Sequence, residues 1–138
     1  MSQFLQVKVE DVHVLLPALQ VHEVTSLEGL VTQSDAHVAW RDRIIALMDL
    51  GQVLGRPSSL PRHFGVVYST TEDGAEPVML QVSEVLGLRT PQPQEWRALP
   101  YIQSRAQALL DAVWVEPPDE RHSYRLRHPV DLSQPPQG

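Results

Sequence analysis

The chain has 138 residues, of which 42% are hydrophobic and 20% charged, and it contains no cysteine. These proportions are typical of one globular unit, and the lack of cysteine excludes disulfides, thiolate nucleophiles and cysteine-based metal sites. A formal net charge of −6 argues against nucleic acid as a partner, because phosphates are bound by basic surfaces. No run approaches the roughly 18 apolar residues of a membrane span, and no leader-like segment opens the chain. We therefore expect a cytoplasmic protein without membrane insertion.

The first predicted elements are two strands, Phe4 to Val9 and Val12 to Leu16, separated only by Glu10 and Asp11. Apolar residues that alternate with a period of two across such a short turn predict a β-hairpin. The alternation puts one set of side chains on the core face, namely Val12, Val14 and Leu16. Pro17 cannot donate to a strand ladder, so we expect the second strand to end there or become an edge.

The most informative stretch runs from Ala36 to Gly55. Its centre, Ile44 to Leu50, is a short apolar run that begins with β-branched residues and is followed by Gly51 and Gly55. This pattern predicts a buried strand followed by a turn or a short helix. We interpret Asp49 as the cap of that turn or helix, because its carboxylate can accept hydrogen bonds from free backbone amides.

The second half of the chain predicts a further β-meander. An Asp73-Gly74 pair between two apolar runs is the strongest hairpin signal in the sequence. The expected elements, in order, are strands at 63–69 and 78–85, a helix at 102–110, and strands at 111–116 and 122–127. About eight to ten short strands bounded by turn residues favour antiparallel barrels or a sandwich over a parallel sheet.

Motifs for catalysis and for cofactors are absent from the sequence. The seven glycines are scattered, so there is no phosphate-cradling loop, and no serine lies in a Gly-x-Ser-x-Gly elbow. His22 and Glu23 resemble the start of a zinc-protease helix, but Ser26 stands where the second histidine is required. His122 and His128 lie among arginines, and we interpret them as surface histidines on a closing strand. We expect no enzymatic activity, no cofactor and no metal.

The tryptophans divide into two kinds of environment. Trp114 lies in the apolar run AVWV and is predicted to be in the core. Trp40 directly precedes Arg41, and tryptophan and arginine are frequent anchors of protein interfaces. Core packing and an interface are equally compatible with Trp40.

The stretch from 36 to 55 resembles the signature of the CheW-like adaptor domains of bacterial chemosensory systems. In that signature, an Asn-Leu-Arg-Gly segment leads into an apolar strand that ends in Asp-Leu, followed by a Leu-Gly turn. The matching residues are Arg41, Asp49, Leu50, Leu54 and Gly55. The departures are Ala39, Asp42 and Ala46, which stand where the family has asparagine, glycine and proline.

The resemblance extends over nearly the whole chain, from Phe4 to Leu132. Pro17 matches the proline of the family's second strand, and the following Val-x-Glu-Val element corresponds to residues 21 to 24. A second signature, Val-Asp-x-Val, corresponds to residues 82 to 85, with Ser83 in place of the aspartate.

The fold that this resemblance implies is mainly β. It consists of two small five-stranded antiparallel β-barrels that share a hydrophobic core, with few short helices. We expect one domain over residues 1–138, with a first barrel at roughly 12–58, a second at roughly 62–116, and terminal segments that complete the barrels. The side chains predicted to be buried are Val12, Val14, Leu16, Ile45, Leu47, Val67, Leu80 and Val82.

The function that the resemblance implies is a scaffold. It would link a CheA-type histidine kinase to the cytoplasmic tip of a methyl-accepting chemoreceptor. The implied protein-binding residues are Arg41, Trp40 and Asp42, with Val21 and Glu23 on a kinase-facing surface. Asp42 could also hold Arg41 in an intramolecular ion pair, and the departures favour a specialised pathway, such as one linked to type IV pili.

The alternative from another functional class is a β-barrel that binds a small ligand or an oligonucleotide. Such a module requires a basic or aromatic-rich face, whereas this chain is acidic and only 6% aromatic.

Overall fold

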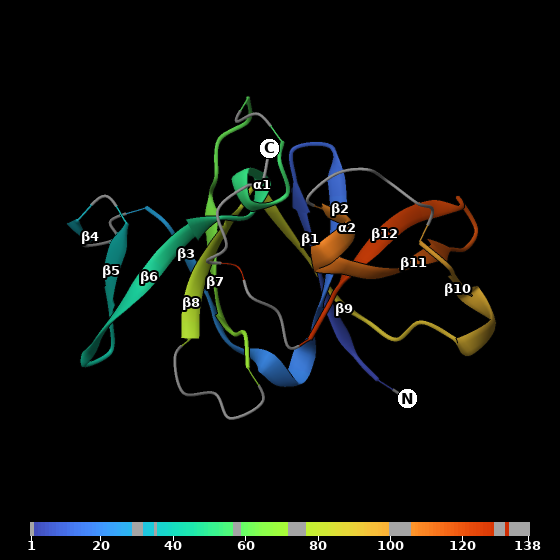
Figure 1. The fold of residues 1–138 in the computed structure, drawn as a ribbon, viewed down its shortest axis with the longest axis horizontal. Coiled ribbons are helices and arrows are strands. Elements are labelled where there is room, and N and C mark those ends of the chain that lie inside the picture. The colour runs from blue at the N-terminus through green and yellow to red at the C-terminus, as the bar shows by residue number, and fades with distance from the viewer. Residues whose placement is uncertain are drawn as a thin grey trace.

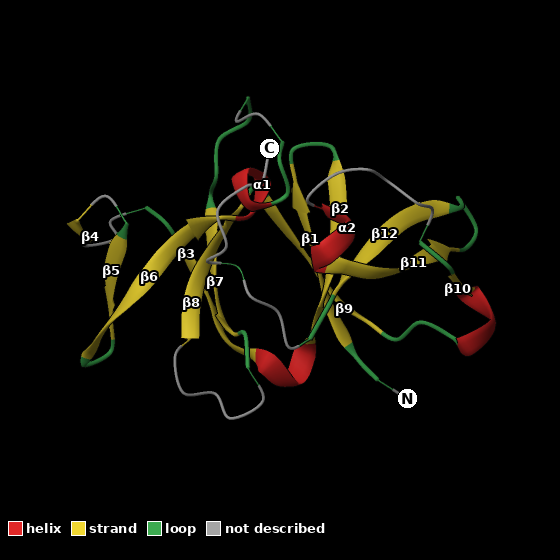
Figure 2. Cartoon of the chain, in the orientation of Figure 1, coloured by secondary structure: helices red, strands yellow, loops and turns green. Residues whose placement is uncertain are grey.

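The structure, a computed structural model, describes residues 2–28, 32–34, 36–56, 59–71, 77–99, 106–128 and 132. These residues form twelve short strands, two short α-helices and two 3-10 turns (Figures 1 and 2). The strands are β1 (Phe4–Val9), β2 (Val12–Pro17), β3 (Val21–Ser26), β4 (Thr32–Ser34), β5 (His37–Trp40), β6 (Arg43–Asp49), β7 (Phe64–Ser69), β8 (Pro77–Val82), β9 (Glu84–Arg89), β10 (Trp96–Arg97), β11 (Leu110–Glu116) and β12 (Arg121–Leu126). The helices are α1 (Leu50–Val53) and α2 (Ala106–Leu109), and the 3-10 turns are η1 (Ala18–Gln20) and η2 (Pro93–Glu95).

The strands form two sheets that stand side by side (Figure 1). Sheet A has the order β10-β11-β12-β2-β1-β9, and sheet B has the order β3-β7-β8-β6-β5-β4. The mainly β class and the two-part architecture are confirmed. Two details differ from the expected five-stranded antiparallel units: each sheet has six strands, and each contains one parallel pair, β12 with β2 and β6 with β8. A parallel pair joins strands that are distant in sequence, so no local turn signal announces it.

Sheet A takes its strands from both ends of the chain, and sheet B takes the middle. The chain passes from β8 of sheet B to β9 of sheet A through the single residue Ser83. The expected division near residues 56–61 is therefore not a boundary between sheets, because β6 and β8 on either side of it pair with each other. The single strand expected over 78–85 is likewise two strands. Glycine and proline mark turns in a sequence, but the break at Ser83 carries neither.

One hydrophobic core joins the two sheets, with side chains from β1 and β2 on one side and β7 and β8 on the other. Seven of the eight side chains predicted to be inside are buried: Val12, Val14, Leu16, Ile45, Val67, Leu80 and Val82. Leu47 is half-buried and packs against a second cluster within sheet B. Each buried aliphatic side chain contributes about 1.5–3 kcal/mol, so this shared core supplies most of the stabilisation.

Strand β2 is buried on both faces. Its even-numbered residues point into the shared core, whereas Leu15 is fully buried in a separate cluster with Phe4 and Trp114. The segment of η2 and β10 covers this cluster. Trp96 meets Phe4 edge-on with ring centroids 5.5 Å apart, and Glu95 accepts a hydrogen bond from the indole Nε1 of Trp114 at 3.1 Å. The burial predicted for Trp114 is confirmed, in a cluster on the other face of the sheet.

The predicted hairpins are confirmed at β1–β2 and β7–β8, and the two strands predicted at 111–116 and 122–127 are β11 and β12, which also pair antiparallel. The Asp73-Gly74 turn itself lies outside the described residues. Of the helix expected over 102–110, the structure describes only residues 106–110, and there α2 ends at Leu109 because Leu110 begins β11.

His122 is exposed on β12, as predicted, but His128 is not a surface histidine. The ring of His128 is half-buried and meets Tyr68 edge-on at 6.3 Å between centroids. Within the part of the chain that the structure describes, no helix has the length and apolar character needed to cross a bilayer.

Candidate docking site

The hairpin of β5 and β6 carries Arg41 at its tip. Trp40 pairs with Arg43, so the turn consists only of Arg41 and Asp42. Arg41 has φ 56, in the left-handed region that glycine and asparagine adopt more readily than arginine does. The left-handed position thus falls on Arg41, and aspartate in place of the family's glycine at residue 42 does not strain this turn.

The side chain of Arg41 is held by two neighbours. Its Cζ lies 4.4 Å from the ring centroid of Trp40, and its Nη2 lies 3.8 Å from Oε1 of Glu23. The side chains of Arg41 and Glu23 are 62% and 42% exposed, so solvent screens the pair to about 1 kcal/mol or less. Among the described ion pairs, Arg41 is joined to Glu23 and not to Asp42, which corrects the intramolecular pair that the sequence suggested. The guanidinium is oriented but remains open to a partner.

Trp40 supports this surface from beneath. It is only 8% exposed, and its ring lies 6.0 Å from that of His22 on β3. His22 in turn is hydrogen-bonded through Nε2 to Oγ of Ser69. The cluster that surrounds Trp40 within sheet B consists of Val38, Ile45, Val67 and Met79. Trp40 is therefore a core residue whose outer face carries Arg41, which confirms core packing, and its part in an interface stays a prediction.

The same contacts bring β3 against the β5–β6 hairpin, although the two segments are separate in the sequence. β3 is the first strand of sheet B and β5 the fifth, yet Glu23 reaches Arg41 and His22 reaches Trp40. Sheet B is therefore curled, with its edge strand against the β5–β6 hairpin. Val21 is half-buried and packs against the shared core, so it supports β3 from inside. Of the five predicted residues, Trp40, Arg41 and Glu23 form one cluster, Asp42 is exposed beside it, and Val21 points inward.

The far end of β6 is closed by a capped helical turn. Oδ1 of Asp49 accepts hydrogen bonds from the backbone amides of Gly51 at 2.9 Å and Gln52 at 3.4 Å, which confirms the predicted cap. Gly55 has φ 77 directly after α1, and the amide of Arg56 donates to the carbonyl of Gly51 at 2.8 Å. Only glycine adopts this conformation without strain, so Gly55 ends the helix.

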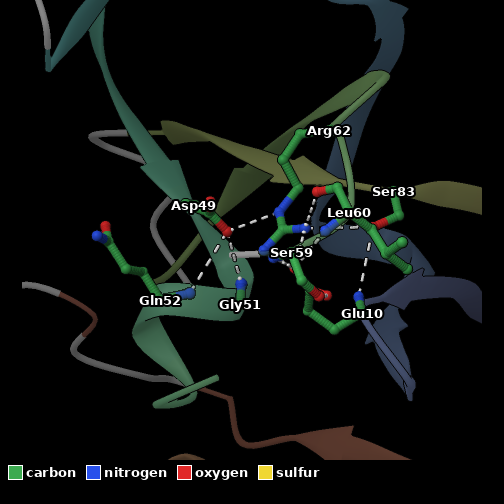
Figure 3. A network of polar contacts seen from close by, with 8 residues as sticks. All are labelled: Glu10, Asp49, Gly51, Gln52, Ser59, Leu60, Arg62 and Ser83. Atoms are coloured by element: carbon green, nitrogen blue, oxygen red, sulfur yellow. Dashed lines mark hydrogen bonds and ion pairs between the residues drawn. The ribbon is translucent and has the colours of Figure 1, made fainter. Parts of the chain in front are cut away.

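A second arginine, Arg62, lies in a buried ion network next to this cap (Figure 3). Its Nε donates to Oδ1 of Asp49 at 2.9 Å, and its Nη1 donates to Oε1 of Glu10 at 2.7 Å. The same Nη1 lies 2.7 Å from the carbonyl of Leu60 and 3.4 Å from Oγ of Ser83. The side chains of Arg62 and Glu10 are each only 7% exposed. The network joins the β1–β2 turn, the end of β6, the loop before β7 and the link between the two sheets.

Glu10 is the most heavily hydrogen-bonded carboxylate of this network. It accepts from Oγ of Ser59 at 2.6 Å, from the amide of Ser59 at 2.8 Å and from the amide of Leu60 at 3.2 Å. The Ser59 hydroxyl, then Arg62 and the two amides, lower the pKa of Glu10 from 4.5 to about 2, against the opposing effect of burial. Burial acts to lower the pKa of Arg62, but the hydrogen bonds and charges of Glu10 and Asp49 outweigh that effect and raise the pKa. Both groups are charged at neutral pH.

Sequence reasoning did not find this network. Glu10 was read only as a turn residue, and Arg62 lies in a proline-rich loop 52 positions away. The one sequence signal is that Glu10 stands in a two-residue hairpin turn where glycine or asparagine is usual, and the structure gives it φ 56. Within the described residues, no group of three or more histidine, aspartate or glutamate side chains could hold a metal ion.

Comparison with known proteins identifies the fold and the family of the chain. The crystal structure of the scaffolding protein TtCheW from Thermoanaerobacter tengcongensis is similar to the chain, with 13% sequence identity and a TM-score of 0.73. The similarity covers 92% of this chain and 90% of that chain, and at this identity it concerns the fold. No curated protein matches the chain. Residues 3–124, which include the Arg41 hairpin and nearly all of both sheets, match the model of the CheW-like domain, and the chain therefore belongs to the CheW-like domain family.

Proposed function

We propose that this protein is a non-enzymatic adaptor of a bacterial chemosensory system, which couples a CheA-type histidine kinase to the cytoplasmic tip of a chemoreceptor. Membership of the CheW-like family supports an adaptor in general. The observation that carries the proposal is the exposed guanidinium of Arg41, held over Trp40 and beside Glu23.

The conformation of Arg41 supports a role outside the fold. A residue with φ 56 costs less when it is glycine or asparagine, so arginine is not the choice that favours folding at this position. Its guanidinium is a planar fork of donors that can hold a carboxylate or a backbone carbonyl of a partner helix. Because Trp40 and Glu23 already orient the fork, binding sacrifices little side-chain entropy.

Glu23 extends the same surface along β3, where His22 and Val24 are also exposed. We propose that this strand contributes to the kinase-facing contact. Each interface is expected to be small and reversible, at or below roughly 800 Å² per partner. The reversal Glu23→Lys would place two cations together at Arg41, so it disturbs both the partner contact and the position of the guanidinium.

The test is co-sedimentation of purified protein with the kinase and receptor fragments of its own host. Arg41→Ala is expected to weaken assembly by about 1–3 kcal/mol, the loss of a central interface contact. Arg97→Ala is the matched control, because Arg97 is exposed in sheet A and, within the part of the chain that the structure describes, donates hydrogen bonds to the carbonyls of Gln94 and Trp96 alone. Normal assembly of the Arg41→Ala protein would remove Arg41 from the docking surface.

The choice of pathway rests on the departures from the family pattern. Ala39, Asp42 and Ala46 support a specialised system, such as one linked to type IV pili, in the cytoplasm. A pull-down from the native host tests this, since the captured kinase identifies the pathway.

A small-ligand module is the second candidate, because a sizeable hollow lies among the described residues. It has a volume of about 700 Å³ and lies between the start of β1, η1 and the end of β12. Phe4 and Leu126 line it, together with Arg125 and His128. Nuclear magnetic resonance shifts at these residues in a fragment screen would favour this function, and their absence would leave the adaptor as the better candidate.

A further inference from the structure

We infer that Arg62 is a positioning residue that sets the orientation of sheet A relative to sheet B. The two carboxylates that it contacts belong to different sheets: Glu10 joins β1 to β2 in sheet A, and Asp49 ends β6 in sheet B. One guanidinium thus bridges the sheets through Nη1 and Nε, at 2.7 Å and 2.9 Å (Figure 3).

The surrounding contacts make this bridge rigid. Ser59 and Leu60 also bind Glu10, so the loop before β7 is fastened to the turn of sheet A through three further hydrogen bonds. Ser83, the residue between β8 of sheet B and β9 of sheet A, meets the bridge from the other side: its Oγ accepts from the amide of Glu10 at 3.3 Å. One of the two covalent crossings between the sheets therefore lies at the ionic link, and the other is η1, between β2 and β3.

The shared hydrophobic core does not by itself provide this directional control. Apolar burial is proportional to area and nearly non-directional, so two packed sheets can shift somewhat while most of that area stays buried. Charge-assisted hydrogen bonds of a planar arginine depend strongly on distance and angle. Both carboxylates keep backbone donors of their own, but a shift of the sheets would separate at least one of them from the guanidinium.

The packing around the guanidinium indicates the same directional fit. A Cβ at Gly51 would lie 2.5 Å from Nη2 of Arg62, so glycine at this position is needed for the close approach. Nη2 is buried and has no hydrogen-bond partner among the described residues. The guanidinium is therefore held in place by its Nε and Nη1 hydrogen bonds and by its close packing against Gly51.

The consequence for docking rests on the proposed function. The proposed docking residues Arg41 and Glu23 both lie in sheet B, so the orientation of sheet A matters to a partner that also contacts sheet A. Loss of Arg62 is expected to leave a contact confined to sheet B nearly unchanged and to reduce the complex that contains both kinase and receptor.

The test measures the distance between the sheets in the isolated protein. The chain has no cysteine, so Ile44→Cys on β6 and His122→Cys on β12, both exposed, accept spin labels selectively. Double electron–electron resonance is expected to give a narrow distance distribution for the parent and a shifted, broader one after Arg62→Met. If Arg62→Met does not fold, Glu10→Gln combined with Arg62→Met removes the unpaired carboxylate, and Arg62→Lys keeps the charge without the fork.

Two controls separate orientation from stability and from charge. Val38→Ala empties part of the cluster inside sheet B, so it should lower the melting temperature without changing the distance. Arg125→Met breaks an ion pair between β11 and β12, which both belong to sheet A. In that pair, Nε of Arg125 lies 2.7 Å from Oδ1 of Asp111. It should also leave the distance unchanged.

An unchanged distribution in the folded Arg62 variants would overturn the inference, as would an equal shift in Val38→Ala. A shift confined to the Arg62 variants supports it. These outcomes need no partner, so a failure of kinase and receptor to bind even the parent would refute the proposed function alone. If kinase and receptor bind the parent protein, an Arg62 variant that has a shifted distance but still forms the complex with kinase and receptor would overturn the link to docking.

Discussion

Arg41 and Arg62 each lie beside a carboxylate from another strand or turn, but only one of them is enclosed. Arg41 meets Glu23 at 3.8 Å with both side chains largely in solvent, whereas Arg62 meets Glu10 at 2.7 Å with both side chains 7% exposed. In water the attraction between two charges is weak, and it strengthens several-fold where the effective dielectric constant falls. The same residue types therefore have opposite roles: Arg41 is available to a partner, and Arg62 is committed to the fold.

The comparison also indicates how each arginine responds to loss of its partner. An exposed charge left alone is hydrated again at little cost. A buried charge left alone keeps its desolvation penalty, so breaking the pair costs more than the pair itself contributes. Mutations at the two sites should differ mainly for this reason.

The largest effect is expected for Arg62→Ala. It leaves the carboxylate of Glu10 without its cation, although the hydrogen bonds from Ser59 and Leu60 remain, so the free energy of unfolding should fall more than in any of the variants below. Urea denaturation followed by tryptophan fluorescence measures this, with Arg41→Ala as the exposed counterpart. A loss below about 1 kcal/mol would show that the network is open to water.

The next effect is expected for Gly51→Ala, whose Cβ would lie 2.5 Å from Nη2 of Arg62. Overpacking of this kind costs about 1–3 kcal/mol. Because the clash is with Arg62, the loss should shrink when Arg62→Ala is already present, and a double-mutant cycle measures that coupling. Additive losses would place the strain elsewhere.

The pH dependence of stability sharpens the comparison through Glu10. Its pKa is lowered from 4.5 to about 2 in the folded protein, so its contribution is complete above about 4.5 and is lost as the pH falls toward 2. Glu10→Gln should therefore flatten the fall in urea midpoint over that window. Glu23→Gln, at the exposed pair, serves as the control, and equal curves for parent and Glu10→Gln would contradict the assignment.

The smallest effect on stability is expected for Arg41→Gly. The change removes a screened ion pair and a cation–π contact of about 0.5–1 kcal/mol, but it relieves the left-handed φ of 56. The two effects nearly cancel, so the melting temperature should change little while binding to receptor and kinase is lost. A large drop in melting temperature would mean that Arg41 closes sheet B rather than serving a partner.

Much of the local structure followed from the sequence. The alternation in residues 4–16 predicted the first hairpin, Asp49 was recognised as a cap, and Gly55 marked the end of the turn after β6. The Arg41 motif led to the CheW-like family and so to the two-part fold. Each of these signals acts within a few residues of the chain, where backbone preference and apolar periodicity decide the outcome.

Tertiary structure decided the rest. Three features depend on contacts between distant segments: the break at Ser83, the two parallel strand pairs, and the assignment of both chain ends to sheet A and of the middle to sheet B. Arg62 and Glu10 lie 52 positions apart, and neither sequence neighbourhood indicates that burial will bring them together. The sequence alone determined which residues pair locally and which family the chain resembles. Only packing decided which arginine is exposed and which is enclosed, because burial is a property of the assembled sheets and not of any single segment.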